Sequence, residues 1–307
     1  MKTRTIAAAV IICSFSALVA AAAALSPAPV SLSQSLVTEI EGYACMGADH
    51  SRKETEQLAM TDARRKGLEY AAGYIAAESR VEDGQLKKDL VTAYSNGKVR
   101  VISEPKKEWY RDPALGDCFR VQTKLEIIPR EEEMLKAVRK VAPDDPSAPL
   151  SVKVWIDRKS YGLGEKVKVC LKGNKPFYGT LVYRDAAGVL VQFLPNPFRK
   201  QNYFHGGTVY ELPSGEDRYE LEILPPFGAE RITVYASTAP VGELNVAPAG
   251  SVYTIRESEE VTARKSRSLN VVPKQSEAGG AAEFVEHFVD LKTENRPPAR
   301  LERQGAP

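Results

Sequence analysis

The sequence predicts an α+β N-terminal domain followed by an all-β, sandwich-like C-terminal domain. The chain has 307 residues, of which 43% are hydrophobic and 27% charged, a composition typical of about two globular domains. In the first half, a long helical segment lies between two alternating segments. From Leu150 onward the sequence instead consists of short alternating segments separated by glycine-containing turns, the pattern of a β-sandwich.

The charge balance indicates no nucleic-acid partner. Lysine and arginine number 42 and aspartate and glutamate 40, which gives a net charge of +2. Removing Lys2 and Arg4 with an N-terminal leader leaves 40 of each sign. A nucleic-acid binder normally carries a clustered basic excess, and none is present.

Residues 1–24 have the pattern of a secretory signal peptide. Lys2 and Arg4 precede an apolar run from Ile6 that ends in alanines, so we expect cleavage near Ala22 to Ala24. The alternative is a retained membrane anchor. Lipidation at Cys13 is not expected, because Ile12 stands where a small residue is needed. The mature chain is therefore predicted to be periplasmic or secreted and not membrane-spanning.

Two alternating segments of the first domain, residues 25–129, predict an antiparallel strand pair. The segment SLVTEIEGYAC has one apolar face and ends at Cys45, and CFRVQTKLEII begins at Cys118 with the same alternation. Pairing Cys45 with Cys118 sets Leu36 opposite Ile127, Glu39 opposite Lys124, Tyr43 opposite Arg120 and Ala44 opposite Phe119, so that both faces match.

That register predicts a Cys45–Cys118 disulfide in an exported protein, with Cys170 free and buried in a strand. The alternative is a redox or metal site. The sequence has no CxxC motif, and His50, His205 and His287 are scattered singly. We therefore expect neither a metal nor a cofactor.

A long helix is predicted between these strands. Ser51 and Glu54 have the spacing of a capping box at its start. Ala59, Ala63, Gly67 and Ala71 follow at four-residue steps and form a row on which a sheet can pack closely. A short helix at 86–93, a turn at Asn96-Gly97 and a strand from Val99 complete the domain.

This series of pieces resembles the N-terminal domain of the FlgT (flagellar H-ring) type of periplasmic module. The matching residues, between Ser35 and Pro129, are Gly42, Ala59, Asp62-Ala63-Arg64, Leu68-Glu69, Ser95, Gly97-Lys98-Val99 and Val121-Gln122-Thr123. The resemblance implies a packing or assembly module without catalytic residues.

Residues 130–149 are predicted to form a helix and a proline-rich linker, and limited proteolysis should cut there. The sandwich domain then spans 150–294. Its strands are expected in LSVKVWID, KVKVCL, YGTLVYRD, VLVQFLP, YELEILP and RITVYAS. A closing strand near Val285 to Thr293, or alternatively an amphipathic helix, follows a long excursion from Val241 to Gly280. Residues 295–307 are expected to be a disordered tail.

The second domain resembles the bacterial domain family DUF4384. The motifs that carry the resemblance occur in order over about 140 residues: Tyr161-x-x-Gly164-Glu165, Gly179-x-Leu181, Ala187-Gly188, Phe193-Leu194-Pro195-Asn196, Tyr203, Gly206-Gly207, Tyr210-x-Leu212-Pro213 and Pro225-Pro226-x-Gly228. The resemblance implies an envelope-associated accessory module of unsettled biochemistry.

One segment of this domain is a candidate binding loop. It combines aromatic with basic side chains, which suits glycan or anionic-polymer contact. The alternative is that the aromatics only cover the sandwich edge. The candidate residues are Phe198, Arg199, Lys200, Tyr203, Phe204 and His205.

No catalytic motif is found in the sequence, and Asp144-Asp145 lie in the linker, where nothing would hold them in catalytic geometry. We therefore expect a non-enzymatic exported accessory protein that acts as a protein-interaction module in a bacterial cell-envelope assembly, with envelope proteins as partners. The alternative hypothesis is a binding module for cell-wall glycan or another envelope polymer.

Overall fold

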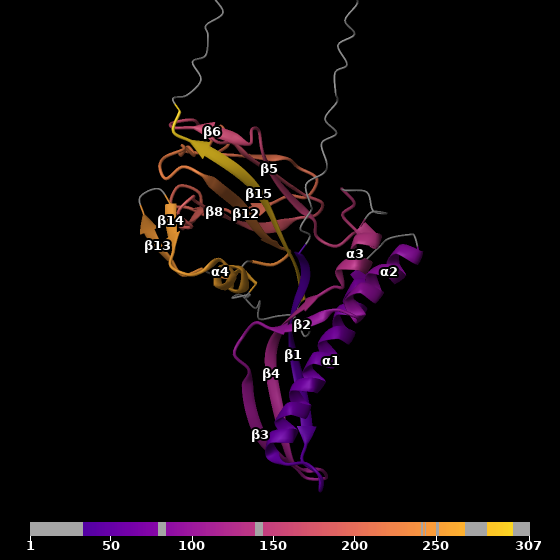
Figure 1. Cartoon of the computed structure of the whole chain (residues 1–307). Coiled ribbons are helices and arrows are strands. Elements are labelled where there is room, and N and C mark those ends of the chain that lie inside the picture. Colours follow the sequence, from indigo (N-terminus) through magenta and orange to yellow (C-terminus); the bar gives the residue numbers. More distant parts are fainter. Residues whose placement is uncertain are drawn as a thin grey trace, which may run out of the picture. The chain divides into compact units, whose positions relative to one another are not determined.

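The structure is a computed structural model that describes residues 33–78, 84–138, 144–240, 242, 244–249, 252–267 and 281–296. The expected signal peptide and most of the expected tail lie outside these residues. The N-terminal part comprises β1 (Ser33–Cys45), α1 (Arg52–Glu78), α2 (Gly84–Ser95), β2 (Lys98–Val101), β3 (Lys106–Asp112), β4 (Gly116–Ile128) and α3 (Glu131–Val138) (Figure 1).

The predicted register of β1 and β4 is confirmed. The strands pair antiparallel from Leu36 opposite Ile127 to Cys45 opposite Cys118, and Cys45 and Cys118 form a disulfide. β2 and β3 both pair with β4 on its other side. Strand β3 was not predicted, because five of the seven residues of its sequence KKEWYRD are charged, all but Trp109 and Tyr110, and show no apolar alternation.

Helix α1 lies along one face of this sheet, as Figure 1 shows. Its start is capped as predicted: the Ser51 amide donates to Glu54 Oε2 at 2.7 Å, and the Glu54 amide donates to Ser51 Oγ at 3.3 Å. The predicted row of small residues is buried against the sheet. At the closest point the helix backbone leaves no room for a side chain at Gly42 of β1.

The C-terminal part is rich in antiparallel strands. They are β5 (Val152–Ile156), β6 (Ser160–Gly162), β7 (Val169–Gly173), β8 (Phe177–Arg184), β9 (Leu190–Leu194), β10 (Tyr203–Phe204), β11 (Tyr210–Leu212), β12 (Ala229–Ser237), β13 (Val246–Ala249), β14 (Val252–Ile255) and β15 (Ala282–Glu294), with helix α4 (Glu259–Ser266) before β15.

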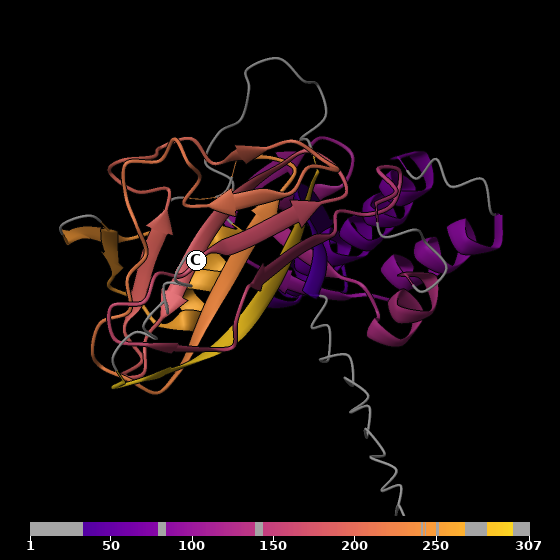
Figure 2. The ribbon, with the colours of Figure 1, turned by 90° about the horizontal axis from the view of Figure 1, so that it is seen from above.

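Two sheets enclose the C-terminal core. A three-stranded sheet, β11-β7-β5, packs its buried side chains against those of β8, β9, β12 and β15 in one apolar cluster. In Figure 2, the orange strand β12 and the yellow strand β15 run side by side beneath the pink strands. The predicted sandwich-like arrangement is therefore present, and the closing segment is a strand rather than a helix.

The two parts share one sheet. Besides pairing with β4, strand β1 pairs with β15 from Ser33 opposite Glu286 to Val37 opposite Ala282. The larger sheet thus runs β13-β14-β9-β8-β12-β15-β1-β4-β2 through both parts of the chain. Because the pairing partners lie about 250 residues apart in sequence, no local pattern could have revealed this junction.

Two predictions about local structure were wrong, and one segment holds elements that were not predicted. The segment YELEILP is not a continuous strand and makes only one isolated bridge, Lys166 to Glu222. Cys170 is free but only half-buried, because it points to the outer face of β7. The excursion before β15 contains the β13–β14 hairpin and helix α4.

Candidate functional site

The predicted binding loop is held by a buried asparagine. The Asn196 side chain is 1% exposed, and its Oδ1 accepts hydrogen bonds from the amides of Phe198 and Arg199, both at 2.8 Å. Its Nδ2 donates to the Phe193 carbonyl at 2.7 Å. This turn leaves Phe198 53% exposed.

Arg199 is engaged within the protein. Its guanidinium pairs with Asp217 at 3.0 Å, and the Ser214 amide donates to the same carboxylate oxygen at 2.7 Å. Burial by itself would raise the pKa of Asp217, but the hydrogen bonds from Ser214 and the charge of Arg199 outweigh it and hold the pKa below its usual value. Phe198, Arg199 and Asp217 line an open hollow of about 610 Å³.

The other aromatic residues of the loop are divided between core and surface. Phe204 is fully buried and stacks on Phe177 at 5.1 Å between ring centroids, so it is not available to a ligand. Tyr203 is partly exposed and packs against Tyr178 and His205. The structure therefore leaves Phe198, Lys200, Tyr203 and His205 near the surface and assigns Phe204 to the core.

A separate apolar groove lies against strands β8, β9, β12, β14 and β15 of the larger sheet and is bounded on its other side by Val167 and residues 220–226. Its volume is about 290 Å³. Hydrogen bonds from Gly164 N to Ile223 O and from Ile223 N to Glu165 O fix the segment that forms one wall. The apolar lining residues are Val167, Val191, Phe193, Leu221, Ile223, Leu224, Pro225, Pro226, Ile232, Val252 and Leu291.

One polar cluster lies at the groove. Tyr183, which lines it, donates a hydrogen bond to Glu230 Oε2, and Thr293 Oγ1 donates to Glu230 Oε1 at 2.7 Å. Glu230 is only 2% exposed. Burial raises the pKa of its carboxyl group, although the two hydrogen bonds oppose this shift.

The rim of the groove is acidic, with Asp185, Glu220 and Glu222 among its lining residues. Asp185 accepts hydrogen bonds from the amides of Ala187 and Val189, and Glu220 pairs with Lys166 at 2.5 Å. Leu224 is 59% exposed at this rim. An apolar groove with an exposed leucine and acidic edges is suited to binding an apolar segment that carries cationic residues.

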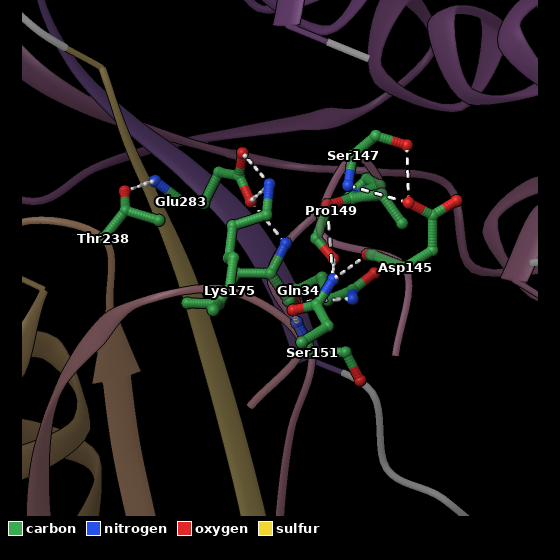
Figure 3. Close-up of polar contacts among 11 residues, drawn as sticks. Gln34, Asp145, Ser147, Pro149, Ser151, Lys175, Thr238 and Glu283 are labelled. Atoms are coloured by element: carbon green, nitrogen blue, oxygen red, sulfur yellow. Dashed lines mark hydrogen bonds and ion pairs between the residues drawn. The ribbon is translucent and has the colours of Figure 1, made fainter. Parts of the chain in front are cut away.

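A buried polar cluster marks the junction where β1 meets β15 (Figure 3). Glu283, 4% exposed, accepts hydrogen bonds from Lys175 Nζ at 3.1 and 3.2 Å and from the Leu150 amide. Gln34 of β1 donates to the Leu150 carbonyl at 2.8 Å. These bonds tie both parts of the chain to the segment 144–151, hereafter the connecting segment.

A second buried ion-pair cluster joins α4 to both parts of the large sheet. Arg267 follows α4 and pairs with Glu126 of β4 at 2.6 Å and with Glu286 of β15 at 3.2 Å. Ser35 of β1 donates to Glu126 at 2.8 Å. These charges are satisfied by one another and hold the strands in place.

In the part of the chain that the structure describes, no group of three or more His, Cys, Asp or Glu residues is placed to hold a metal ion. His287 accepts a hydrogen bond from the Val154 amide at 3.2 Å, and burial lowers its pKa. Within the same residues, no helix is both long enough and apolar enough to cross a lipid bilayer.

Sequence reasoning missed the groove. The sequence feature that could have revealed it is the pair of adjacent apolar residues, Ile223 and Leu224, directly before Pro225-Pro226. A strand with alternating faces should not place two apolar residues side by side ahead of prolines. The alternation of YELEILP predicts a strand, but the prolines end regular pairing and leave Leu224 at the surface.

Comparison with protein-family models places a match over the groove. Residues 160–240 match the family described as "Domain of unknown function (DUF4384)", which confirms the predicted resemblance over this stretch. Most of the groove lining, from Val167 to Ile232, falls inside the match. Neither the curated proteins nor the solved structures include a match to this chain.

Proposed function

We propose that this chain is a non-enzymatic, exported accessory protein that acts as a protein-interaction module in a bacterial cell-envelope assembly. The observation that carries this proposal is the apolar groove at an open side of the sandwich, with Leu224 exposed at its rim. Exposed apolar surface with a polar edge is typical of a protein-binding site. The acidic rim favours a partner segment that combines apolar side chains with lysine or arginine.

Export is supported by the signal-peptide pattern of residues 1–24 and by the Cys45–Cys118 disulfide, since disulfides persist in oxidising compartments. A role in an envelope assembly is supported by the resemblance of the N-terminal part to the FlgT (flagellar H-ring) type of module. Membership of a flagellar assembly is the narrower form of the same proposal.

The sheet shared by both parts of the chain also bears on how two partners would be positioned. Because β1 pairs with both β4 and β15, the groove-bearing sandwich and the α1-covered sheet are joined by backbone hydrogen bonds. A partner held in the groove would be positioned relative to any partner of the N-terminal part without a conformational change.

Site-specific photo-cross-linking tests the proposal. A photoreactive residue replaces Leu224, and a matched control carries it at Leu115, a leucine of nearly equal exposure, 59% against 58%, in the distant β3–β4 turn. In the native compartment we expect position 224 to cross-link to a defined envelope protein, whose contact peptide is apolar and basic, and position 115 not to do so.

The same experiment can refute the proposal. Equal cross-linking at both positions, or none at 224, would show that the groove does not bind a partner. A cross-link from 224 to a second copy of the chain would identify self-association instead. An intact Met1 on the mature protein would contradict export.

A further inference from the structure

The outer face of the three-stranded sheet carries an exposed tryptophan beside lysines. On β5, Val152 and Val154 point into the core, whereas Lys153 and Trp155 point outward, and Trp155 is 37% exposed. On the neighbouring strand β7, Lys172 lies directly opposite Lys153. A large aromatic side chain is thus displayed on the outer face, where core packing does not require it.

This face is hollowed beside the connecting segment. A cavity of about 310 Å³ is lined by Lys153, Trp155 and Lys172 from the sheet and by Asp144, Ser151, Gly173 and Asn174 around its edge. The volume lies at the lower end of the range for small-molecule sites, roughly 300 to 1,000 Å³, and is enough for one sugar ring.

The edge of the hollow is fixed in place before any ligand binds. The Asn174 side chain is 5% exposed, and its Nδ2 donates to the carbonyls of Asp145 at 2.8 Å and Pro149 at 3.1 Å. The Ser151 amide donates back to Asn174 Oδ1 at 2.8 Å. Figure 3 shows the connecting segment held by these bonds next to the Glu283–Lys175 pair. A ligand would therefore not have to order this wall.

The charges of the hollow leave one cation available. Lys172 pairs with Asp144 at 2.7 Å. Among the described residues Lys153 makes no hydrogen bond or ion pair, although its charge helps to lower the pKa of His287, and the Trp155 ring stacks on no other ring or cation there. Two lysines and one aspartate give the hollow a net charge of +1, located at Lys153.

We propose that this hollow binds one acidic sugar residue of an envelope polysaccharide. The apolar C–H face of the sugar ring would stack on the Trp155 indole. Its carboxylate would bind the Lys153 ammonium in a charge-assisted hydrogen bond. This site is distinct from the groove and from the loop at Phe198, and it gives the molecule a contact with the cell wall in addition to a protein partner.

Titration calorimetry with two defined probes tests this assignment. The acidic probe is a hyaluronan hexasaccharide, in which glucuronate alternates with N-acetylglucosamine, and the neutral probe is an N-acetylglucosamine hexamer. We expect the acidic probe to bind at least tenfold more tightly than the neutral one, and its affinity to fall as salt is raised.

Two substitutions separate the two parts of the site. Trp155→Ala should weaken both probes at least tenfold, while Trp155→Phe retains most of the affinity. Lys153→Gln should remove the preference for the acidic probe and its salt dependence without affecting the neutral one. Phe198→Ala is the control for the predicted loop, and Leu224→Asp is the control for the groove; both should leave sugar binding unchanged.

Several results would overturn the assignment. These are no binding of either probe at millimolar concentration, unchanged affinity in Trp155→Ala, or loss of binding in Phe198→Ala. Equal affinity for a thymidine octanucleotide would show a general stacking surface for anionic polymers rather than a sugar site. Loss of binding in Leu224→Asp alone would place the sugar in the groove and contradict both proposals.

Discussion

Substitution of Gly42 tests whether the close packing of α1 on β1 stabilises the fold. A Cβ built at Gly42 would lie 2.3 Å from the Ala59 carbonyl oxygen, 2.5 Å from the Ala63 amide nitrogen and 2.7 Å from Ala63 Cβ. Two of these contacts are with helix backbone, which cannot rotate away. Gly42→Ala must therefore displace the helix, and overpacking of this kind costs about 1–3 kcal/mol, occasionally more.

The chain contains a matched control for this substitution. Gly73 lies on the exposed side of the same helix, and a Cβ there meets nothing within 4 Å. Replacing a glycine inside a helix with alanine stabilises it by roughly 0.5–1 kcal/mol. The two variants are thus expected to shift the free energy of unfolding in opposite directions, and to differ by about 1.5–4 kcal/mol.

Chemical denaturation of the oxidised protein, followed by circular dichroism at 222 nm, measures both effects on the same helix. We expect a lower midpoint for Gly42→Ala and a higher midpoint for Gly73→Ala, with equal slopes. A Gly42→Ala midpoint at or above that of the wild type would refute the close helix–sheet contact.

Three further predictions follow from the same structure. Replacing both Cys45 and Cys118 with alanine should lower the free energy of unfolding by about 4 kcal/mol, since their disulfide closes 73 residues; Cys170→Ser is the control and should change it little. Glu230→Gln should stabilise the protein at pH 7 and less so near pH 4. Burial raises the pKa of Glu230 in the folded state, so the free-energy cost of ionising it is present at neutral pH and disappears when the carboxylate is protonated. A difference in unfolding free energy between variant and wild type that grows toward low pH would contradict this. Because the pKa of Asp217 is held below its usual value, its contribution is present at neutral pH and is lost as pH falls through the folded-state pKa. The protection factor of the Ser214 amide, the ratio of its intrinsic to its observed exchange rate at the same pH, should therefore fall in acid in the wild type and should be low at all pH values in Asp217→Asn.

The N-terminal part could be predicted to the level of individual residue pairs because its apolar and polar side chains follow regular periods along the sequence. Alternation fixed both faces of β1 and β4, and two cysteines at the strand ends allowed one register that satisfied all of them. The capping residues Ser51 and Glu54 marked the start of α1 for the same reason, since a cap depends on neighbours three residues apart.

The candidate sites were harder to predict, since each depends on contacts that a local pattern does not encode. The aromatic and basic residues of the loop are adjacent in sequence. However, Phe204 pairs with Phe177 across two strands, and its ring is buried in the core. Asp217, 18 residues away in sequence, binds Arg199. In the sequence, Trp155 is one aromatic residue within the expected strand LSVKVWID. Only its place on the outward side of β5, beside the connecting segment, makes it a candidate binding residue.

The junction of the two parts explains why the polar clusters there are buried. β1 is the only strand of the described residues that pairs with both β4 and β15, and Leu36 and Val37 pair with both, so the register there must be fixed from two sides. A backbone ladder alone would tolerate a shift in register, because it repeats along the strand. Three side-chain interactions, in contrast, can each form in one register only. They join Gln34 to Leu150, Glu283 to Lys175, and Ser35 to Glu126. We infer that these buried bonds specify the register of the junction, which in turn fixes how the connecting segment meets Trp155 and thereby shapes the proposed sugar site.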